Sequence, residues 1–321
     1  MKFLVFGFSV TAETSGKNGY VERCAARCTT ERPAFDVTRV GIGGLQPNHA
    51  RHLIEGILDE TKPDALILEI ATAVYRQRPK TDEQIADHTA TLEAAFEACR
   101  MRNMRCGILD LPLTGTSETE DWMVETDQAV ARAYNVPVHV VPLDESLLRD
   151  NVHPNDDGKD HYAQALLELL DQVAASEQDF SGLAPSRRFG AFAIRDIKTS
   201  AARFRPFSRA DFSEQALEIP GGETVTVGLP KKVCASGLIM LMGPKTGKLQ
   251  VRTGQKGSSV NCYDRHCYYE RAGGWPLNPE VTDTLHITQT ADVPDVELLK
   301  GEKDLGPRCG GVTHILFEET N

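Results

Sequence analysis

The first 175 residues alternate between short apolar runs and amphipathic stretches, and this alternation limits the fold more than any other feature of the chain. Apolar runs of strand-like composition occur at residues 2–6, 34–40, 65–70, 105–111 and 136–141. Apolar residues recur at the three- and four-residue spacing of helices over 19–27, 48–60, 82–102, 119–134 and 156–175. Strands that alternate with helices in this way predict a parallel sheet covered on both faces, with right-handed crossovers.

The composition and the hydrophobic pattern of the sequence change after about residue 176. The rest of the chain is rich in Gly and Pro, and its strand candidates are short: 224–229, 238–242, 249–253, 284–288 and 312–317. Short strands separated by turn residues predict an antiparallel sandwich or a jelly-roll-like module. We therefore expect an α/β domain over residues 1–178 and a mainly β accessory domain over residues 179–321.

Length and charge narrow the classes of function. A chain of 321 residues is long enough for two domains with separate cores. The formal net charge of −11 argues against binding to a nucleic-acid backbone, which needs a concentrated basic surface. No apolar run approaches the roughly 18–20 residues that span a bilayer, and the first apolar stretch is too short for the core of a signal peptide. A cytoplasmic protein without a membrane span is the expectation.

Several candidate residues follow the carboxyl ends of the predicted strands. Ser9 and Gly44 come directly after the first two strands, and two further loops begin after Ile70 and Val141. In open parallel sheets, reactive loops lie beyond the carboxyl ends of the strands. These four segments are therefore expected to share one site.

A serine and a D-x-x-H loop are the strongest chemical signal. Ser9 follows a strand and a glycine turn, and Asp150 and His153 are three residues apart in the segment DNVHP. An imidazole that accepts a serine proton needs a carboxylate on its other nitrogen, and this loop can supply both groups. Pro154 also restricts His153 to an extended backbone. An ordinary polar loop is the alternative interpretation.

Four segments together resemble the SGNH (GDSL) hydrolase family. The first block of that family is similar to FGFSVTAE…GYVERCAARC, and the second is similar to GIGG. The place of the third block is occupied by LEIATA, and the last block matches DNVHP. The resemblance covers residues 1–175. It implies a flavodoxin-like, three-layer α/β/α hydrolase domain that removes or transfers acyl groups through a serine acyl-enzyme, with no metal or organic cofactor.

The resemblance also implies roles for individual residues. It makes Ser9 the nucleophile, His153 the general base and acid, and Asp150 the group that orients His153. The backbone N–H groups of Gly44 and Ser9 become donors to the oxyanion. Such donors stabilise a tetrahedral intermediate by a few kcal/mol each.

Two positions depart from the family pattern. Phe8 stands where the family has an aspartate before the serine, and Ala73 stands at the position of the third-block asparagine, which is an oxyanion donor. The oxyanion hole therefore lacks one side-chain donor unless Thr72, Asn48 or another group replaces it.

Two of the candidate pocket residues have a second interpretation. Asn48 lines the pocket in one interpretation and is the N-cap of a helix in the other, because apolar periodicity starts soon after it. Arg76 binds an anion or a sugar of the substrate in one interpretation and is a solvated loop cation in the other.

Other polar clusters have structural explanations. The acidic group Asp156, Asp157, Asp160 and His161 does not have calcium-loop spacing, and acidic residues suit the first turn of a helix. Cys262, His266 and Cys267 lack the two close pairs of a convincing zinc site. The eight cysteines are expected to be reduced thiols.

An aromatic stretch marks the second half. Tyr263, Tyr268, Tyr269 and Trp275 can stack on sugar rings, pack against a partner subunit in a homo-oligomer formed through the C-terminal domain, or belong to the core. The sequence leaves these three interpretations open.

The sequence as a whole predicts a serine esterase. We expect it to hydrolyse a short-chain ester, such as an acetyl ester, of a small molecule or a carbohydrate. One alternative is an acyltransferase that moves the acyl group onto a saccharide. The other is a carbohydrate-binding or assembly protein with a weakened catalytic site.

Overall fold

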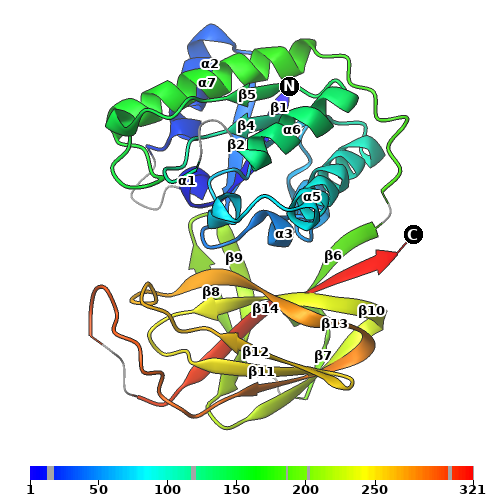
Figure 1. The fold of residues 1–321 in the computed structure, drawn as a ribbon, viewed down its shortest axis with the longest axis vertical. Helices are drawn as coiled ribbons and strands as arrows, with labels where there is room; N and C mark the ends of the chain where they lie inside the picture. The colour runs from blue at the N-terminus through cyan, green and yellow to red at the C-terminus, as the bar shows by residue number, and fades with distance from the viewer. Residues whose placement is uncertain (13–17, 117–120, 186, 201–202, 303–305, 321) are drawn as a thin grey trace. The chain divides into compact units, whose positions relative to one another are not determined.

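The computed structural model describes residues 1–12, 18–116, 121–185, 187–200, 203–302 and 306–320 (Figure 1). Contacts divide the chain into two compact units. The first is Met1–Ser186 with Ala210–Phe212, and the second is Arg187–Arg209 with Ser213–Asn321.

The first unit is built on a parallel five-stranded sheet in the order β2-β1-β3-β4-β5. The strands are β1 (Lys2–Gly7), β2 (Asp36–Gly41), β3 (Ala65–Glu69), β4 (Arg105–Asp110) and β5 (Val138–Val140). The apolar runs of β1, β3 and β4 are buried along nearly their whole length, as expected for strands covered on both faces. The strand order reverses direction between β1 and β3, which is where this topology places ligand sites.

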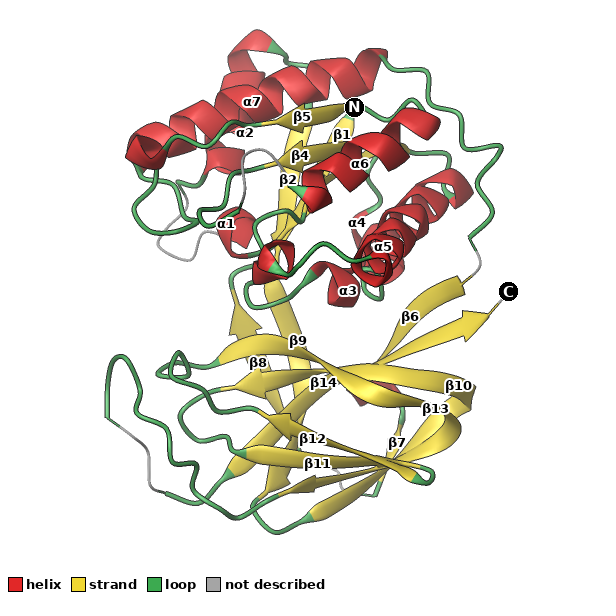
Figure 2. Ribbon diagram, viewed as in Figure 1, coloured by secondary structure: helices red, strands yellow, loops and turns green. Residues whose placement is uncertain are grey.

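Helices cover both faces of this sheet, which confirms the three predicted layers (Figure 2). One face carries α2 (Tyr20–Glu31) and α7 (Asp156–Ala175), whose apolar residues pack on β1, β3 and β4. The other carries α4 (Ile54–Thr61), α5 (Asp82–Met101) and α6 (Trp122–Ala133). Four short elements occupy loops: α1 (Ser9–Ala12), α3 (Pro47–Ala50), and the 3-10 turns η1 (Val74–Gln77) and η2 (Glu145–Leu147).

The predicted helix over 48–60 is two helices, α3 and α4. The side chain of Gln46 accepts a hydrogen bond from the backbone of His49, and His49 Nδ1 accepts one from the Gln46 amide. This reciprocal capping box starts a helix at Pro47. Interpreting Asn48 as an N-cap is therefore wrong, because Asn48 lies inside α3.

The second unit is mainly β, as predicted, and its strands pair antiparallel. Its elements are β6 (Arg187–Ala193), η3 (Ile194–Asp196), β7 (Lys198–Thr199), β8 (Phe204–Arg209), β9 (Phe212–Pro220), β10 (Thr224–Met242), β11 (Lys248–Thr253), β12 (Lys256–Asn261), β13 (Arg271–Gln289) and β14 (Cys309–Thr320).

Two long strands organise this second unit. The candidate strands 224–229 and 238–242 are the two ends of β10, which pairs with β13 along most of its length. The pairing shifts register between Gly228 and Val233 and again between Ala235 and Gly237. Such irregularities bend a strand, so the two ends of β10 pair with different neighbours, β7 at one end and β14 at the other.

Candidate active site

Ser9 lies directly beyond the carboxyl end of β1 and opens α1. The loop that follows β2 approaches it closely, because a Cβ added to Gly43 would lie 3.7 Å from the Ser9 Cβ. The next residue, Gly44, has φ of 91°, a left-handed conformation that favours glycine. The structure therefore brings the GIGG segment against the candidate nucleophile, with Gly43 as the residue beside the serine.

Asp150 and His153 form the second part of the site. His153 Nδ1 lies 3.0 Å from both carboxylate oxygens of Asp150. Because a carboxylate only accepts hydrogen bonds, Nδ1 carries a proton, and the neutral tautomer of this imidazole has its free lone pair on Nε2. Burial raises the pKa of Asp150, but hydrogen bonds from the His153 and Val152 amides and from the imidazole outweigh it and lower the pKa below its usual value.

Backbone hydrogen bonds close the loop that carries this pair. The Arg149 amide donates to the His153 carbonyl at 2.9 Å, and the Asn155 amide donates to the Leu147 carbonyl at 2.8 Å. Thr114, which follows β4, donates to the Asn151 carbonyl. The imidazole therefore projects from a defined loop and not from an open coil.

The structure gives no direct bond between the two halves of the predicted triad. Among the described residues, no hydrogen bond joins the Ser9 hydroxyl to His153, and none is made by His153 Nε2. Catalytic hydrogen bonds are often long in an enzyme without substrate and shorten only in the complex.

Sequence reasoning missed Glu69, the last residue of β3. Its side chain is fully buried and accepts hydrogen bonds from the Thr11 hydroxyl at 2.8 Å and the Thr72 hydroxyl at 2.7 Å. The backbone N–H of Phe8 is a further donor. Burial raises the pKa of Glu69 to about 7, while these three donors act to lower it. An acidic residue in the otherwise apolar run ALILEI was the sequence signal that could have revealed this carboxyl group.

The two candidates for the missing oxyanion donor differ in their surroundings. Thr72 is buried, and its hydroxyl proton is committed to Glu69. Asn48 Oδ1 is buried without a hydrogen-bond partner among the described residues. Ala73, at the position of the family asparagine, is also buried.

Arg76 is buried, so its interpretation as a solvated loop cation is wrong. It is 8% exposed, its Nη2 lies 2.5 Å from Asp121 Oδ2, and its Nη1 donates to the Leu111 carbonyl at 2.8 Å. Arg76 and Asp121 line a cavity of about 420 Å³ beyond the carboxyl ends of β4 and β5. Ser9, Asp150 and His153 are not among the residues that line it.

A second buried polar cluster lies at the end of β4. Asp110 is buried beside Asp127, and no described group donates a hydrogen bond to its carboxyl oxygens. Burial and the neighbouring Asp127 raise the pKa of Asp110 well above its usual range, and burial raises that of Asp127 to about 8. His88 Nε2 lies 2.7 Å from Asp127 Oδ1, and burial lowers the pKa of His88 to about 4. At neutral pH the cluster therefore holds a neutral His88 imidazole and an Asp127 carboxyl group that is mostly protonated.

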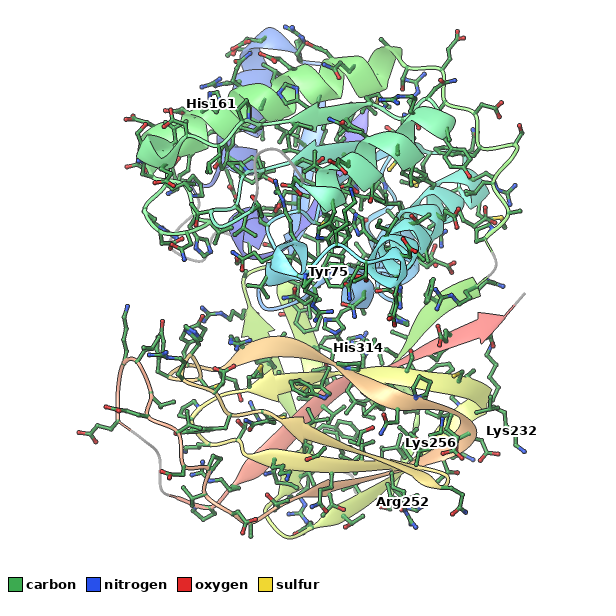
Figure 3. The ribbon with its side chains drawn as sticks, in the orientation of Figure 1. Tyr75, His161, Lys232, Arg252, Lys256 and His314 are labelled. Atoms are coloured by element: carbon green, nitrogen blue, oxygen red, sulfur yellow. The ribbon has the colours of Figure 1, made fainter. Side chains whose placement is uncertain are left out.

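The acidic group at the start of α7 makes ion pairs with α2. Asp156 and Asp160 each lie 3.0 Å from Arg23, while His161 lies further along α7 (Figure 3).

In the described part of the chain, no cluster of three His, Cys, Asp or Glu side chains has the geometry of a metal site. All eight cysteines are free thiols. No described helix is long and apolar enough to cross a membrane.

The aromatic residues of the second unit divide between core and surface. Tyr263 is fully buried, whereas Trp275 is 36% exposed. The rings of Tyr268 and Tyr269 meet edge to face with centroids 4.8 Å apart, and the Arg209 guanidinium lies 4.0 Å from the Tyr269 centroid. Core packing therefore accounts for Tyr263 but not for the exposed ring of Trp275.

Comparisons with known proteins identify the fold. No family model matches the sequence, and no curated protein matches it either. A solved structure of a two-domain esterase active on acetylated mannans matches the whole chain with a TM-score of 0.72, 14% identity and 92% coverage of the esterase chain. The structure of such an esterase co-crystallised with mannopentaose matches with a TM-score of 0.71, 14% identity and 91% coverage. The chain therefore shares the two-domain fold of these structures, with an α/β unit followed by a mainly β unit.

Proposed function

We propose that this protein is a serine esterase in which Ser9, His153 and Asp150 form the catalytic triad. The observation that carries the proposal is the His153–Asp150 pair, which fixes the proton on Nδ1 and leaves Nε2 as a base. The contact between Ser9 and the GIGG segment supports the assignment of the nucleophile.

The reaction is an acyl transfer through a covalent intermediate. The Ser9 oxygen attacks the ester carbonyl carbon, and its proton passes to His153 Nε2. The bond to the leaving alcohol then breaks, and His153 returns the proton to that alcohol. Water attacks the acyl-enzyme with His153 again as base, which releases the carboxylic acid and regenerates Ser9.

The oxyanion is stabilised by backbone N–H groups in this proposal. Gly44 and Ser9 supply these donors, and Asn48 lies close along the chain from Gly44. The third block supplies no side-chain donor, because Ala73 has none and the Thr72 hydroxyl donates to Glu69. Since each oxyanion donor contributes a factor of roughly 10²–10³ to kcat, slow turnover is expected.

The substrate class that we propose is an acetyl or other short-chain ester of a carbohydrate. The two-domain fold supports this choice, because the structures that match the whole chain are those of esterases active on acetylated mannans. Trp275 offers an exposed ring in the second unit on which a sugar could stack. Arg76 is a weaker candidate for binding substrate, since Asp121 and two backbone carbonyls occupy its guanidinium.

Hydrolysis of p-nitrophenyl acetate tests the proposal. Ser9→Ala is expected to lower kcat by at least a factor of about 10³ while the protein stays folded, because the nucleophile is removed. Ser213→Ala is the matched control, since that hydroxyl donates to Ser208 within the second unit. Equal activity of Ser9→Ala and Ser213→Ala would remove Ser9 from the mechanism.

A second candidate is a carbohydrate-binding protein with a weakened catalytic site. The absence of a third-block donor at Ala73 and Thr72 favours it. Binding of an acetylated oligosaccharide without release of acetate would support this candidate, and transfer of the acyl group to a saccharide would support an acyltransferase.

A further inference from the structure

Glu69 occupies a special position in the sheet. It pairs in register with Gly7, the last residue of β1, across the point where the strand order reverses. Ser9 follows Gly7 by two residues. The Glu69 carboxyl group therefore lies beneath the turn that carries the candidate nucleophile, at the switch point of the sheet.

The hydrogen bonds of Glu69 bracket Ser9 along the chain. Phe8, immediately before Ser9, donates its backbone N–H, and Thr11, two residues after Ser9, donates its hydroxyl to Oε2. Thr72, from the loop after β3, donates to Oε1 at 2.7 Å. One carboxyl group thus connects the first turn of α1 to the loop that occupies the place of the third block.

The local backbone is shaped to admit this carboxyl group. A Cβ on Gly7 would lie 2.7 Å from Glu69 Oε2 and 2.3 Å from Thr11 Oγ1. Glycine is therefore required at residue 7 by the network itself. The aspartate that usually precedes the serine is replaced here by Phe8, and the carboxyl group beneath the turn comes instead from the neighbouring strand.

We propose that the Glu69 carboxylate is a positioning residue for Ser9, which holds the nucleophile turn through Phe8, Thr11 and Thr72. This inference rests on the proposed function, in which Ser9 is the nucleophile. Glu69 does not touch substrate in this role. It acts by fixing where the Ser9 hydroxyl lies relative to His153.

The ionised form of Glu69 is the form that fits the network. Two carboxylate oxygens can accept from three donors at once, whereas a proton on either oxygen would face a hydroxyl that already donates there. The titratable groups that surround Glu69 are Tyr20 on α2, Tyr162 on α7 and Asp110 on β4. Burial raises the pKa of all three, and the two tyrosines stay neutral while Glu69 titrates.

Labelling of Ser9 by a fluorophosphonate probe, measured as a rate constant against pH, tests the inference on the full chain. In the wild-type protein, labelling needs the ionised form of Glu69, whose pKa is about 7, so the labelling rate should fall more steeply below pH 7 than in Glu69→Gln. Glu69→Gln has no carboxyl group to titrate at this position, so this extra dependence on pH should disappear. The labelling rate at pH 8.5 should fall by about tenfold or more, because misplaced catalytic groups react slowly.

Asp110→Asn is the matched control. Asp110 is an equally buried carboxyl group at the end of the adjacent strand, and its oxygens have no described hydrogen bond to the nucleophile turn. Asp110→Asn should keep the wild-type labelling rate within about twofold.

Steady-state kinetics with p-nitrophenyl acetate give a second measurement. The KM of Glu69→Gln should stay near the wild-type value while kcat falls.

Thr11 provides a second pair of variants in case Glu69→Gln does not fold. Thr11→Ser keeps the hydroxyl that donates to Glu69 and should label at the wild-type rate, while Thr11→Val should label as slowly as Glu69→Gln. If Glu69→Gln and Thr11→Val both label at the wild-type rate, the positioning role is wrong and the proposed function stands. If folded wild-type protein is not labelled at Ser9, the proposed function and the positioning role both fail.

Discussion

Two acidic side chains end neighbouring strands of the sheet, Glu69 on β3 and Asp110 on β4, and both are fully buried. Glu69 is surrounded by hydrogen-bond donors, and its pKa is raised only to about 7. Asp110 has no described donor and lies beside a second carboxyl group, and burial together with that neighbour raises its pKa well above the usual range. Burial alone does not decide the charge of a strand-end carboxyl group, because donors decide whether the ion is tolerated.

This difference follows the topology of the sheet. β3 borders the switch point, so Glu69 faces the turn after β1 and its backbone and hydroxyl donors. β4 lies one strand further along, where Asp110 meets Asp127 of α6 and the imidazole of His88. We therefore assign Glu69 to the site and Asp110 to a structural cluster.

The largest expected effect is a change in folding stability with pH, caused by the buried cluster of Asp110, Asp127 and His88. Asp127 titrates at about 8 in the folded protein and near its ordinary value of about 4 when unfolded. The pKa of Asp127 is higher in the folded than in the unfolded protein, so its contribution to the free energy of unfolding is fully present below pH 4. That contribution is lost as pH rises from 4 to 8, by roughly 5 kcal/mol at most. Asp127→Asn removes this titration and keeps an acceptor for His88.

Urea denaturation between pH 4 and 9 measures the effect. Asp127→Asn should be more stable than the wild type at pH 8, with a flatter dependence on pH. The exposed Asp36→Asn is the control and should follow the wild-type curve. Parallel curves for Asp127→Asn and the wild type would contradict the account of this cluster.

The second-largest expected effect is a loss of folding stability when a side chain is placed at Gly7, beside Glu69. Gly7→Ala places a Cβ 2.7 Å from the Glu69 carbonyl oxygen, which belongs to the backbone of β3 and cannot move aside. We expect it to lower the free energy of unfolding by about 3 kcal/mol. Gly56→Ala on α4 meets nothing within 4 Å and should stabilise by roughly 1 kcal/mol. Similar stabilities for the two variants would show that the network tolerates a side chain at residue 7.

The smallest effect separates two buried tyrosines whose rings meet edge to face. The Tyr20 hydroxyl lies 2.8 Å from Thr11 Oγ1, whereas the Tyr162 hydroxyl has no described partner. Tyr20→Phe should therefore cost about 1 kcal/mol, and Tyr162→Phe should cost nothing or stabilise slightly. Thermal unfolding of the pair distinguishes them, and equal costs would place Tyr20 outside the network.

Local patterns predicted the layers of the first unit well. Apolar runs and helical spacing located its strands, because strands buried on both faces must be apolar throughout. The break between α3 and α4 was missed, since apolar residues continue at helical spacing from Ile54 back to Ala50, while the capping box depends on Gln46. In the second unit, Pro230 and two lysines interrupt the apolar pattern of β10, so one long strand was predicted as two.

The site was predictable only where its partners are close in sequence. Asp150 and His153 are three residues apart, so the bond between them follows from the loop itself. Arg76 meets Asp121 and Glu69 meets Thr11 across 45 and 58 residues, so nothing local reveals either contact. An acidic residue inside an apolar strand was nevertheless a usable signal, since burial of such a group requires a reason.

The central claim is that Ser9 is an activated nucleophile, and mass-spectrometric mapping of the fluorophosphonate adduct tests it most directly. The account predicts a single labelled peptide that contains Ser9 in the wild type, no adduct in Ser9→Ala and much slower labelling in Asp150→Asn, which fixes the wrong tautomer of His153. An unlabelled Ser9 in folded protein, or labelling of Ser9 that does not depend on Asp150, would contradict it.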